Sequence, residues 1–564
     1  MTFRKRRKTS YSFVDPDEIF LDSQNLPHFN KQQFEGRLEK PIPKRSVFLL
    51  SGFFIFIGIL FITQLGNLQI ARGEMYLKKS QNNVLVKLPI FADRGIIYDR
   101  SGKKLVWNSW GEDSDRLIAP TREYIKEGGF SHLLGYVSYP AKDSQGNYWQ
   151  DYFLGKDGVE KLYDTNLKGK NGVHISERDV KGNIISDNTV SQPAHGSDLY
   201  LSIDAGVQAT LHKSIVAMAG SASFSGGAGV IMDVNNGEIL ALTSYPEYNS
   251  GILSKGADRK LVNGYINDKR KVFLNRATQG LYTPGSIVKP FIGYAALVEN
   301  VITPFKQIYS NGKIEIQNPY FKDKKTVFND HGVFGYVDMR EAIAVSSDVY
   351  FYEIGGGYQD QKGLGITNID LYLQKFGITQ KTGIDLGGEK AGIIPTPEWK
   401  LKTFKGDPWR VGDTYNTSIG QYGVQVTPIQ MARAVGGIAT FGTLQTPHVL
   451  YRDDSMEAKK IEIDVNKEMM QVIHEGMRQV VTEGTGTALN VKGVEVAAKS
   501  GTAQVGYGNT NTNSWIIGFF PYKNPRYAFA VLMERGPKAA SGNATRVMAE
   551  TLDYMSVYAP EYIK

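Results

Sequence analysis

The chain has 564 residues, a formal net charge of +8 and a hydrophobic fraction of 41%. This length exceeds what one compact core organises, so we expect two or three domains, and the composition excludes a protein with many membrane spans. The lack of cysteine excludes disulfides, thiolate catalysis and cysteine zinc sites. The basic charge suits anionic lipid or polymer, but without a recognisable nucleic-acid-binding fold we expect no nucleic-acid partner.

Residues 1–45 form a basic tail, and residues 46–65 form a run of 20 residues without a charged side chain. As a helix, this run would span ~30 Å, the thickness of the hydrocarbon layer of a membrane. Ten Lys or Arg precede the run and three follow it within 14 residues, so the positive-inside rule places the N-terminus in the cytoplasm and everything after Leu65 outside. A cleaved signal peptide is the alternative, but the run begins late and lacks a small-x-small cleavage site. We therefore predict a largely disordered tail and an uncleaved single-pass membrane anchor.

Residues 66–221 form a second region, whose first landmark is the run ADRGIIYDRSGKKLVWN from Ala92 to Asn108. Two short apolar runs flank the turn-like residues 99–102, a pattern that predicts a β-hairpin. No pattern in this region carries chemistry of its own. We interpret the region as a spacer and interaction platform.

Residues 222–564 combine strand-like and helical patterns. Apolar runs at 226–234 and 238–245 flank Asn235-Asn236-Gly237, a strong hairpin signal. Three more strands are expected within 494–505, 514–520 and 527–534, and apolar residues at helical spacing predict a closing helix over 544–558. These patterns predict an α+β domain with five strands.

Ser286 lies in the run YTPGSIVK (282–289), three positions before Lys289 and at the start of an apolar helix expected to reach Asn300. One helical turn brings an amine at i+3 to the same face as a hydroxyl at i. A serine becomes a nucleophile when a nearby base takes its proton, and a lysine serves as that base only where its pKa is lowered. Alone, the pair is also compatible with an exposed helical turn.

Two further motifs follow in order. SSD at Ser346–Asp348 precedes an aromatic run, and KSGT at Lys499–Thr502 lies in a strand-like stretch. Each has a plain structural explanation, as a helix start and as a strand-edge lysine. Together with Ser-x-x-Lys, however, they are typical of penicillin-binding proteins and class A β-lactamases. The chain resembles the class B penicillin-binding proteins, most closely the elongation type.

The resemblance implies a catalytic role in acyl transfer for each motif residue. Ser286 would be the nucleophile and Lys289 its base. Ser346 would pass a proton to the departing amine, and Asp348 would accept a hydrogen bond from Lys289 or from the substrate backbone. Lys499 would add positive potential beside Ser346.

The same resemblance implies a substrate site along the third motif. Gly501 would let a substrate backbone approach the strand, and the hydroxyls of Ser500 and Thr502 would bind a substrate carboxylate. The backbone N–H groups of Ser286 and Thr502 would form the oxyanion hole, in which the loss of one donor typically costs ~100- to 1,000-fold in rate.

The family fold implied for residues 222–564 is that of the penicilloyl-serine transferases, an antiparallel five-stranded sheet beside a helical subdomain. The run at 92–108 also resembles the family's motif Arg-Gly-x-Ile-x-Asp-Arg-x-Gly, so residues 66–221 are expected to be the elongated pedestal, a dimerisation-type domain that contacts a polymerase partner.

Three details favour the elongation type over the division type. Thr283 stands before Pro-Gly where division-type relatives usually carry Glu, the second motif ends in Asp348 where many of them have Asn, and residues 409–421 resemble the elongation-type Gly-Asp-Thr…Gly-Gln loop. In one departure, Gln421-Tyr422-Gly423 replaces the usual Gln-Gly-aromatic, so the shape of this loop does not follow from the family.

Some relatives bind zinc between the first two motifs. Here only Asp330 and His331 look like ligands, and two adjacent residues rarely make a site. We predict no metal and no cofactor.

The resemblance implies a serine-type D-Ala-D-Ala transpeptidase that cross-links peptidoglycan stem peptides during cell-wall elongation and is acylated by β-lactams. Residues 66–221 hold no paired-glutamate motif for sugar polymerisation, so a SEDS-family glycosyltransferase and other elongation-complex proteins are the expected partners. The expected location is the cytoplasmic membrane, with the catalytic domain on the periplasmic or wall side.

Three alternatives stay open: a division-type transpeptidase, a DD-carboxypeptidase or β-lactamase-like hydrolase, and a non-catalytic activator of a wall polymerase. The pedestal argues against a secreted β-lactamase, and the intact motif residues argue against an inactive protein.

Overall fold

The structure, a computed structural model, describes residues 43–563 except 83–84, 112–116, 145, 179–183, 257, 319–320, 322, 452–458, 539 and 541. The tail is predicted to be disordered, and its residues 1–42 lie outside the described residues. Contacts divide the chain into two units, Met1–Val86 with Arg178–Asn183, and Lys87–Glu177 with Ile184–Lys564.

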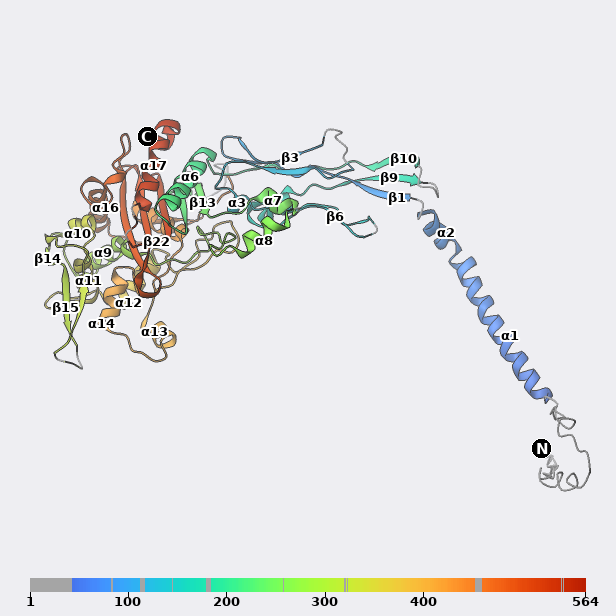
Figure 1. Cartoon of the computed structure of the whole chain (residues 1–564), viewed down its shortest axis with the longest axis horizontal. Coiled ribbons are helices and arrows are strands. Elements are labelled where there is room, and N and C mark those ends of the chain that lie inside the picture. The colour runs from blue at the N-terminus through green and yellow to red at the C-terminus, as the bar shows by residue number, and fades with distance from the viewer. Residues whose placement is uncertain are drawn as a thin grey trace, which may run out of the picture. The chain divides into compact units, whose positions relative to one another are not determined.

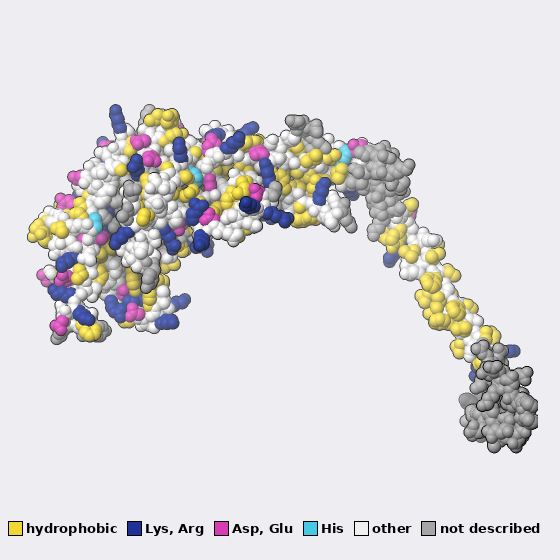
Figure 2. All heavy atoms as spheres, viewed as in Figure 1, with side chains coloured by type: hydrophobic (Ala, Val, Ile, Leu, Met, Phe, Trp, Pro, Cys, Tyr) yellow, Lys and Arg dark blue, Asp and Glu magenta, His cyan; other side chains and the backbone are white. Residues whose placement is uncertain are grey.

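The first unit contains the predicted membrane span. α1 (Lys44–Gly66) continues through the π-helical turn η3 (Asn67–Ala71), and α2 (Gly73–Asn82) follows (Figure 1). No charged residue occurs between Arg45 and Arg72, so the apolar helix is longer than the predicted 20 residues. None of it is buried, and its hydrophobic side chains lie uncovered along the helix (Figure 2). Within the described residues it is the one helix long and apolar enough to cross a membrane.

The second unit contains the predicted five-stranded sheet, with the order β13-β12-β22-β21-β20. The strands are β12 (Gly226–Asp233), β13 (Ile239–Tyr245), β20 (Ala497–Val505), β21 (Asn511–Phe520) and β22 (Tyr527–Pro537). Every neighbouring pair is antiparallel, which confirms the predicted fold. β20, which carries the third motif, is an edge strand of this sheet.

Helices cover both faces of the sheet, and the strands alternate accordingly. α6 (Ala205–Ser221) and α17 (Ala544–Tyr558) pack on one face, with Val531 and Met533 in the same core cluster. α15 (Pro428–Ala439) packs on the other face, together with Ala530 and Leu532. The predicted boundary at residue 222 assigns α6 to the pedestal, although α6 packs on the sheet. The boundary itself stays a prediction.

The helical subdomain is built around α9 (Lys289–Val298), in which every residue from Lys289 to Leu297 is buried. α10 (Met339–Val345), α11 (Asp348–Gly356), α12 (Gly365–Lys375) and α16 (Lys467–Thr482) all pack against α9. α16 also packs against β20, so this helix links the subdomain to the edge of the sheet. α13 (Pro397–Thr403) and α14 (Val411–Ser418) complete the subdomain.

The predicted hairpin of the pedestal is confirmed. β2 (Ile97–Tyr98) pairs antiparallel with β3 (Lys104–Ser109), in a sheet of order β11-β2-β3-β4 that also contains β4 (Thr121–Tyr124) and β11 (Leu199–Tyr200). The Asp99 carboxylate accepts hydrogen bonds from the N–H groups of Ser101 and Lys103, which fixes the turn. A second sheet of the order β1-β9-β10 contains β1 (Leu85–Ile90), β9 (Gly172–Arg178) and β10 (Ile184–Ser191).

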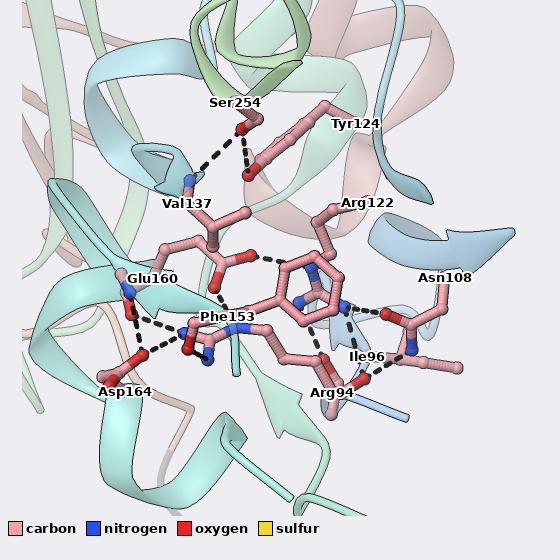
Figure 3. Close-up of polar contacts among 12 residues, drawn as sticks. Arg94, Ile96, Asn108, Arg122, Tyr124, Val137, Phe153, Glu160, Asp164 and Ser254 are labelled. Atoms are coloured by element: carbon pink, nitrogen blue, oxygen red, sulfur yellow. Dashed lines mark hydrogen bonds and ion pairs between the residues drawn. The ribbon is translucent and has the colours of Figure 1, made fainter. Parts of the chain in front are cut away.

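A buried ion network in the pedestal joins the 92–108 run, through Arg94, to Arg122 and Glu160 (Figure 3). Glu160 accepts from Arg94 at 2.6 Å and from Arg122 at 2.8 Å, and all three side chains are almost completely buried. Arg94 also contacts Asp164 at 2.7 Å. Since two buried guanidinium groups share one carboxylate, the network depends on Glu160.

We expect Glu160→Gln to lower the free energy of unfolding by about 3–5 kcal/mol, because it leaves buried arginine charges without their partner. Chemical denaturation of the detergent-solubilised chain measures this loss. The matched control is Glu127→Gln in the half-exposed Lys103–Glu127 pair, for which we expect less than about 1 kcal/mol. Equal losses in the two variants would contradict the prediction.

Candidate active site

Ser286 lies on a tight turn rather than within a regular α-helix. The serine turn is the 3-10 helix η4 (Gly285–Val288), which leads directly into α9 at Lys289. Three residues complete one turn of a 3-10 helix, so side chains at i and i+3 line up. We predict an α-helix from Ser286 to Asn300, but its first turn is a 3-10 turn, which is tighter. This turn places Lys289 on the same side of the chain as Ser286.

Neighbouring backbone closes the serine turn on two sides. Gly285 has a φ of 60° and donates to the carbonyl of Gly420 at 3.0 Å, and a Cβ at Gly420 would lie only 2.2 Å from the Gly285 oxygen. A Cβ at Gly501 of β20 would lie 2.8 Å from Ile287 Cγ2 and 3.0 Å from Pro284 O. Gly501 thus lets β20 approach the serine turn, a packing role beside the substrate role that the sequence predicts.

Lys289 is fully buried, and its amine contacts the second motif. Nζ donates to Ser346 O at 2.5 Å, to Ser346 Oγ at 3.3 Å and to Asp348 Oδ1 at 2.7 Å. The expected hydrogen bond from Lys289 to Asp348 is therefore present. Among the described residues, no hydrogen bond joins Lys289 to Ser286, so the structure brings the lysine to the second motif more closely than to the serine.

The second motif is a turn between two helices. Ser346 ends α10 in the left-handed conformation, with φ 62° and ψ 35°, and Ser347 begins α11 as an N-cap that accepts from Tyr350 N. Asp348 is the first residue of α11. Burial alone would raise the pKa of Asp348, but the charge of Lys289, nearby His331 and the hydrogen bond from Lys289 lower it.

Lys499 is buried in β20. Its amine donates to the carbonyl of Ser500 at 2.9 Å, and no carboxylate of the described residues forms a salt bridge with it. Burial lowers the pKa of Lys499 well below its usual value, and the charge of Lys289 lowers it further against the opposing effect of Asp348. The sequence predicts positive potential from Lys499, whereas its burial works against a charge on the amine.

Ser500 and Thr502 alternate with Lys499 and Gly501 along β20. Ser500 is half-buried and its hydroxyl lies 2.6 Å from Thr485 Oγ1, while Thr502 is exposed. Both hydroxyls therefore lie on the opposite side of the strand from the buried amine. A Cβ at Gly285 would lie 2.9 Å from Thr502 O, which places Thr502 beside the serine turn.

The unusual Gln421-Tyr422-Gly423 sequence is accommodated by an aromatic cluster. Tyr422 adopts φ 56°, a conformation that glycine takes more easily, and its ring stacks on Phe404 at 6.2 Å. Trp399 and Trp409 contact the same ring edge-on. The loop that carries Gly420 is thus anchored by side chains of its neighbours.

Asp330 and His331 contact the second motif, which sequence spacing alone does not indicate. The buried Asp330 carboxylate accepts from Ser347 Oγ at 2.8 Å and from Val349 N at 2.9 Å. His331 Nδ1 lies 2.8 Å from Asp330 and 3.9 Å from Asp348. The sequence shows that Asp330 and His331 are adjacent, but it does not show that they contact the second motif.

Asp348 adds a third candidate ligand to Asp330 and His331, because ligand atoms of the three lie within 4.8 Å of one another. Three protein ligands are the number that a catalytic zinc ion takes. The protons of His331 and Lys289 balance the carboxylate charges of this cluster. The predicted lack of a metal stays a prediction.

The pKa of His331 predicts a pH-dependent contribution to stability. The Asp330 carboxylate at 2.8 Å and the negative charge of Asp348 at 3.9 Å raise this pKa from 6.5 to about 9. A raised pKa means that the folded chain holds the proton more tightly, so the stabilisation is complete below about pH 6.5 and is lost as the pH rises through about 9. We expect the difference in Tm between wild type and His331→Asn to be largest near pH 6 and smallest near pH 9.5, in thermal melts across this range. A difference that grows with pH would contradict the assignment.

Comparison with known proteins identifies the region that holds all three motifs. The penicillin binding protein transpeptidase domain matches residues 227–553, and the penicillin-binding protein dimerisation domain matches residues 117–201. The peptidoglycan D,D-transpeptidase MrdA of Haemophilus influenzae is 28% identical over 91% of this chain and 91% of its own length.

Two solved structures are also similar. PBP2 of Pseudomonas aeruginosa in complex with WCK 5153 is 29% identical with a TM-score of 0.66, and the match covers 85% of this chain and 98% of that one. The complex between PBP2 and MreC from Helicobacter pylori matches with 26% identity and a TM-score of 0.67, over 84% of this chain and 99% of that one. The matched transpeptidase domain spans more than half of the residues. The chain therefore belongs to the penicillin-binding protein family and carries its dimerisation and transpeptidase domains.

Proposed function

We propose that this protein is an elongation-type peptidoglycan D,D-transpeptidase that works through an acyl-enzyme on Ser286. The observation that carries this proposal is the contact of Lys289 with Ser346 and Asp348 one turn beyond the serine. β20 packs against the same turn through Gly501. The turn that carries Ser286 and Lys289 therefore contacts both other motif segments, a pattern that supports a common site.

In this proposal, Ser286 Oγ attacks the carbonyl carbon of the penultimate D-Ala of a stem peptide. A C–O bond forms, the amide C–N bond breaks, and the terminal D-Ala leaves after its nitrogen takes up a proton. An amine of a neighbouring stem peptide then attacks the ester, forms the new amide bond and releases Ser286. A β-lactam follows the first half of this sequence, because its strained amide mimics the D-Ala-D-Ala bond.

The proton of Ser286 passes to Lys289 and leaves through Ser346. The reacting form of Lys289 is the free amine, which takes the proton of Ser286 as Oγ attacks; the ammonium so formed directs its protons at Ser346 O, Ser346 Oγ and Asp348. Ser346 Oγ, 3.3 Å from Nζ, is the route by which that proton reaches the departing amine. Asp348 holds Lys289 in place, and Lys499, whose pKa is lowered by burial and by the charge of Lys289, lies near the same network.

The substrate binds along β20. As an edge strand beside the serine turn, β20 offers its backbone to an extended peptide, and the exposed hydroxyl of Thr502 together with that of Ser500 binds the terminal carboxylate. The backbone N–H groups of Ser286 and Thr502 stabilise the oxyanion, as the family resemblance implies.

The membrane and partner proteins complete the proposal. The apolar helix anchors the chain in the cytoplasmic membrane with the transpeptidase domain outside, in agreement with the excess of positive charge before residue 46. Polymerisation of the sugar strand then falls to a separate SEDS-family glycosyltransferase. The similarity to PBP2 of Helicobacter pylori, whose structure was solved in complex with MreC, supports a further partner that resembles MreC.

We expect penicillin to form a covalent adduct on the tryptic peptide that contains Ser286, because the serine turn is the one place where all three motifs meet. Mass spectrometry of the digested, labelled chain tests this, with Ser286→Ala as the control that should give no adduct. An adduct on a different peptide would contradict the proposal. An adduct on Ser286 that is lost within seconds would instead indicate a hydrolase.

A further inference from the structure

Ser346 adopts a backbone conformation that its own residue type does not favour. A φ of 62° is uncommon for a residue other than glycine, asparagine or aspartate, and it persists only where the surroundings enforce it. This conformation is what turns both the carbonyl oxygen and Oγ of Ser346 toward Lys289. The N–H groups of Ser346 and Ser347 bond back to carbonyls of α10, which closes the turn locally, and contacts from outside the motif add to this.

Asp330 holds the residues that follow Ser346. Its carboxylate, with a side chain exposed by 0%, accepts from the hydroxyl of Ser347 at 2.8 Å and from the N–H of Val349 at 2.9 Å. Ser310 donates to the same oxygen at 3.3 Å. Because Ser347 is the N-cap of α11, Asp330 fixes the start of this helix from outside it.

His331 holds the residue before Ser346. Its Nε2 lies 3.1 Å from the carbonyl of Val345, the last residue of α10, while Nδ1 lies 2.8 Å from Asp330. Both ring nitrogens face acceptors, so the doubly protonated imidazolium satisfies both contacts. The other carboxylate within reach is Asp348, whose Oδ2 lies 3.9 Å from Nδ1.

We infer that Asp330 and His331 form a clamp that positions Ser346 for proton transfer. The contacts fall on residues 345, 347 and 349, on both sides of Ser346, and leave the serine hydroxyl to Lys289. The two residues act through the turn and are positioning residues rather than catalytic ones. The inference rests on the proposed role of Ser346 in the function above.

The clamp predicts a loss in the chemical step and not in binding. A misplacement of about 1 Å at a reacting group costs up to ~100-fold in rate. We therefore expect Asp330→Asn and His331→Gln to lower the first-order rate constant of acylation by a fluorescent penicillin by about 10- to 100-fold. The dissociation constant of the preceding non-covalent complex should stay within about twofold, because β20 is untouched.

The measurement uses the full chain in detergent after treatment with a chelator, with rates expressed per active site by burst titration. Loss of folded protein then lowers the amplitude without changing the rate constant. The matched control is Asp268→Asn. Like Asp330, Asp268 accepts a hydrogen bond from a backbone N–H, here that of Arg270, whose side chain it also contacts, but it lies at the end of α8 (Arg259–Asn267). We expect this control to acylate at the wild-type rate.

A double variant shows whether the clamp acts through Ser346. Asp330→Asn should slow acylation in the wild-type background and have no further effect in a Ser346→Ala background. An equal slowing in both backgrounds, a wild-type rate in both clamp variants, or a change confined to the dissociation constant would each overturn the clamp. A wild-type chain that is not labelled at Ser286 would instead refute the proposed function, and a wild-type rate in Ser346→Ala would refute the proposed role of Ser346.

Discussion

The site depends on the hydrogen bonds and the ion pair that the buried amine of Lys289 forms with the second motif. A buried charge is costly unless an opposite charge and hydrogen bonds compensate for its lost hydration. Asp348 at 2.7 Å and the carbonyl of Ser346 at 2.5 Å supply that compensation. Both groups belong to the turn between α10 and α11. The buried amine of Lys289 needs hydrogen-bond and charge partners, and this need fixes the position of the second motif.

Two buried lysines meet this need in different ways. Lys289 has a carboxylate partner, whereas Lys499 has, among the described residues, the carbonyl of Ser500 and a pKa that burial lowers. Glycines at 420 and 501 allow the backbone segments around Ser286 to approach one another closely. A side chain at either position would push these segments apart.

Much of this could be predicted from the sequence. The apolar run, the Asn-Asn-Gly hairpin and the order of three short motifs depend on local patterns, and the strands and helices follow them. The 3-10 turn at Ser286 could not be predicted, because backbone from Gly420 closes it. The contacts of Asp330 depend on a fold that brings residue 330 to residue 347, and the state of Lys499 depends on burial, which a strand pattern does not reveal. The packing of α6 on the sheet could not be predicted either, because its sequence does not indicate whether it belongs to the pedestal or to the sheet.

A double-mutant cycle of acylation rates tests most directly whether the ion pair between Lys289 and Asp348 organises the site. The account predicts that Asp348→Asn slows acylation by penicillin strongly in the wild-type chain, and that it adds nothing once Lys289 is replaced in Lys289→Met, since groups that act as one unit are not additive. If Asp348→Asn slowed acylation by the same factor in both backgrounds, Asp348 would act independently of Lys289 and the account would be wrong.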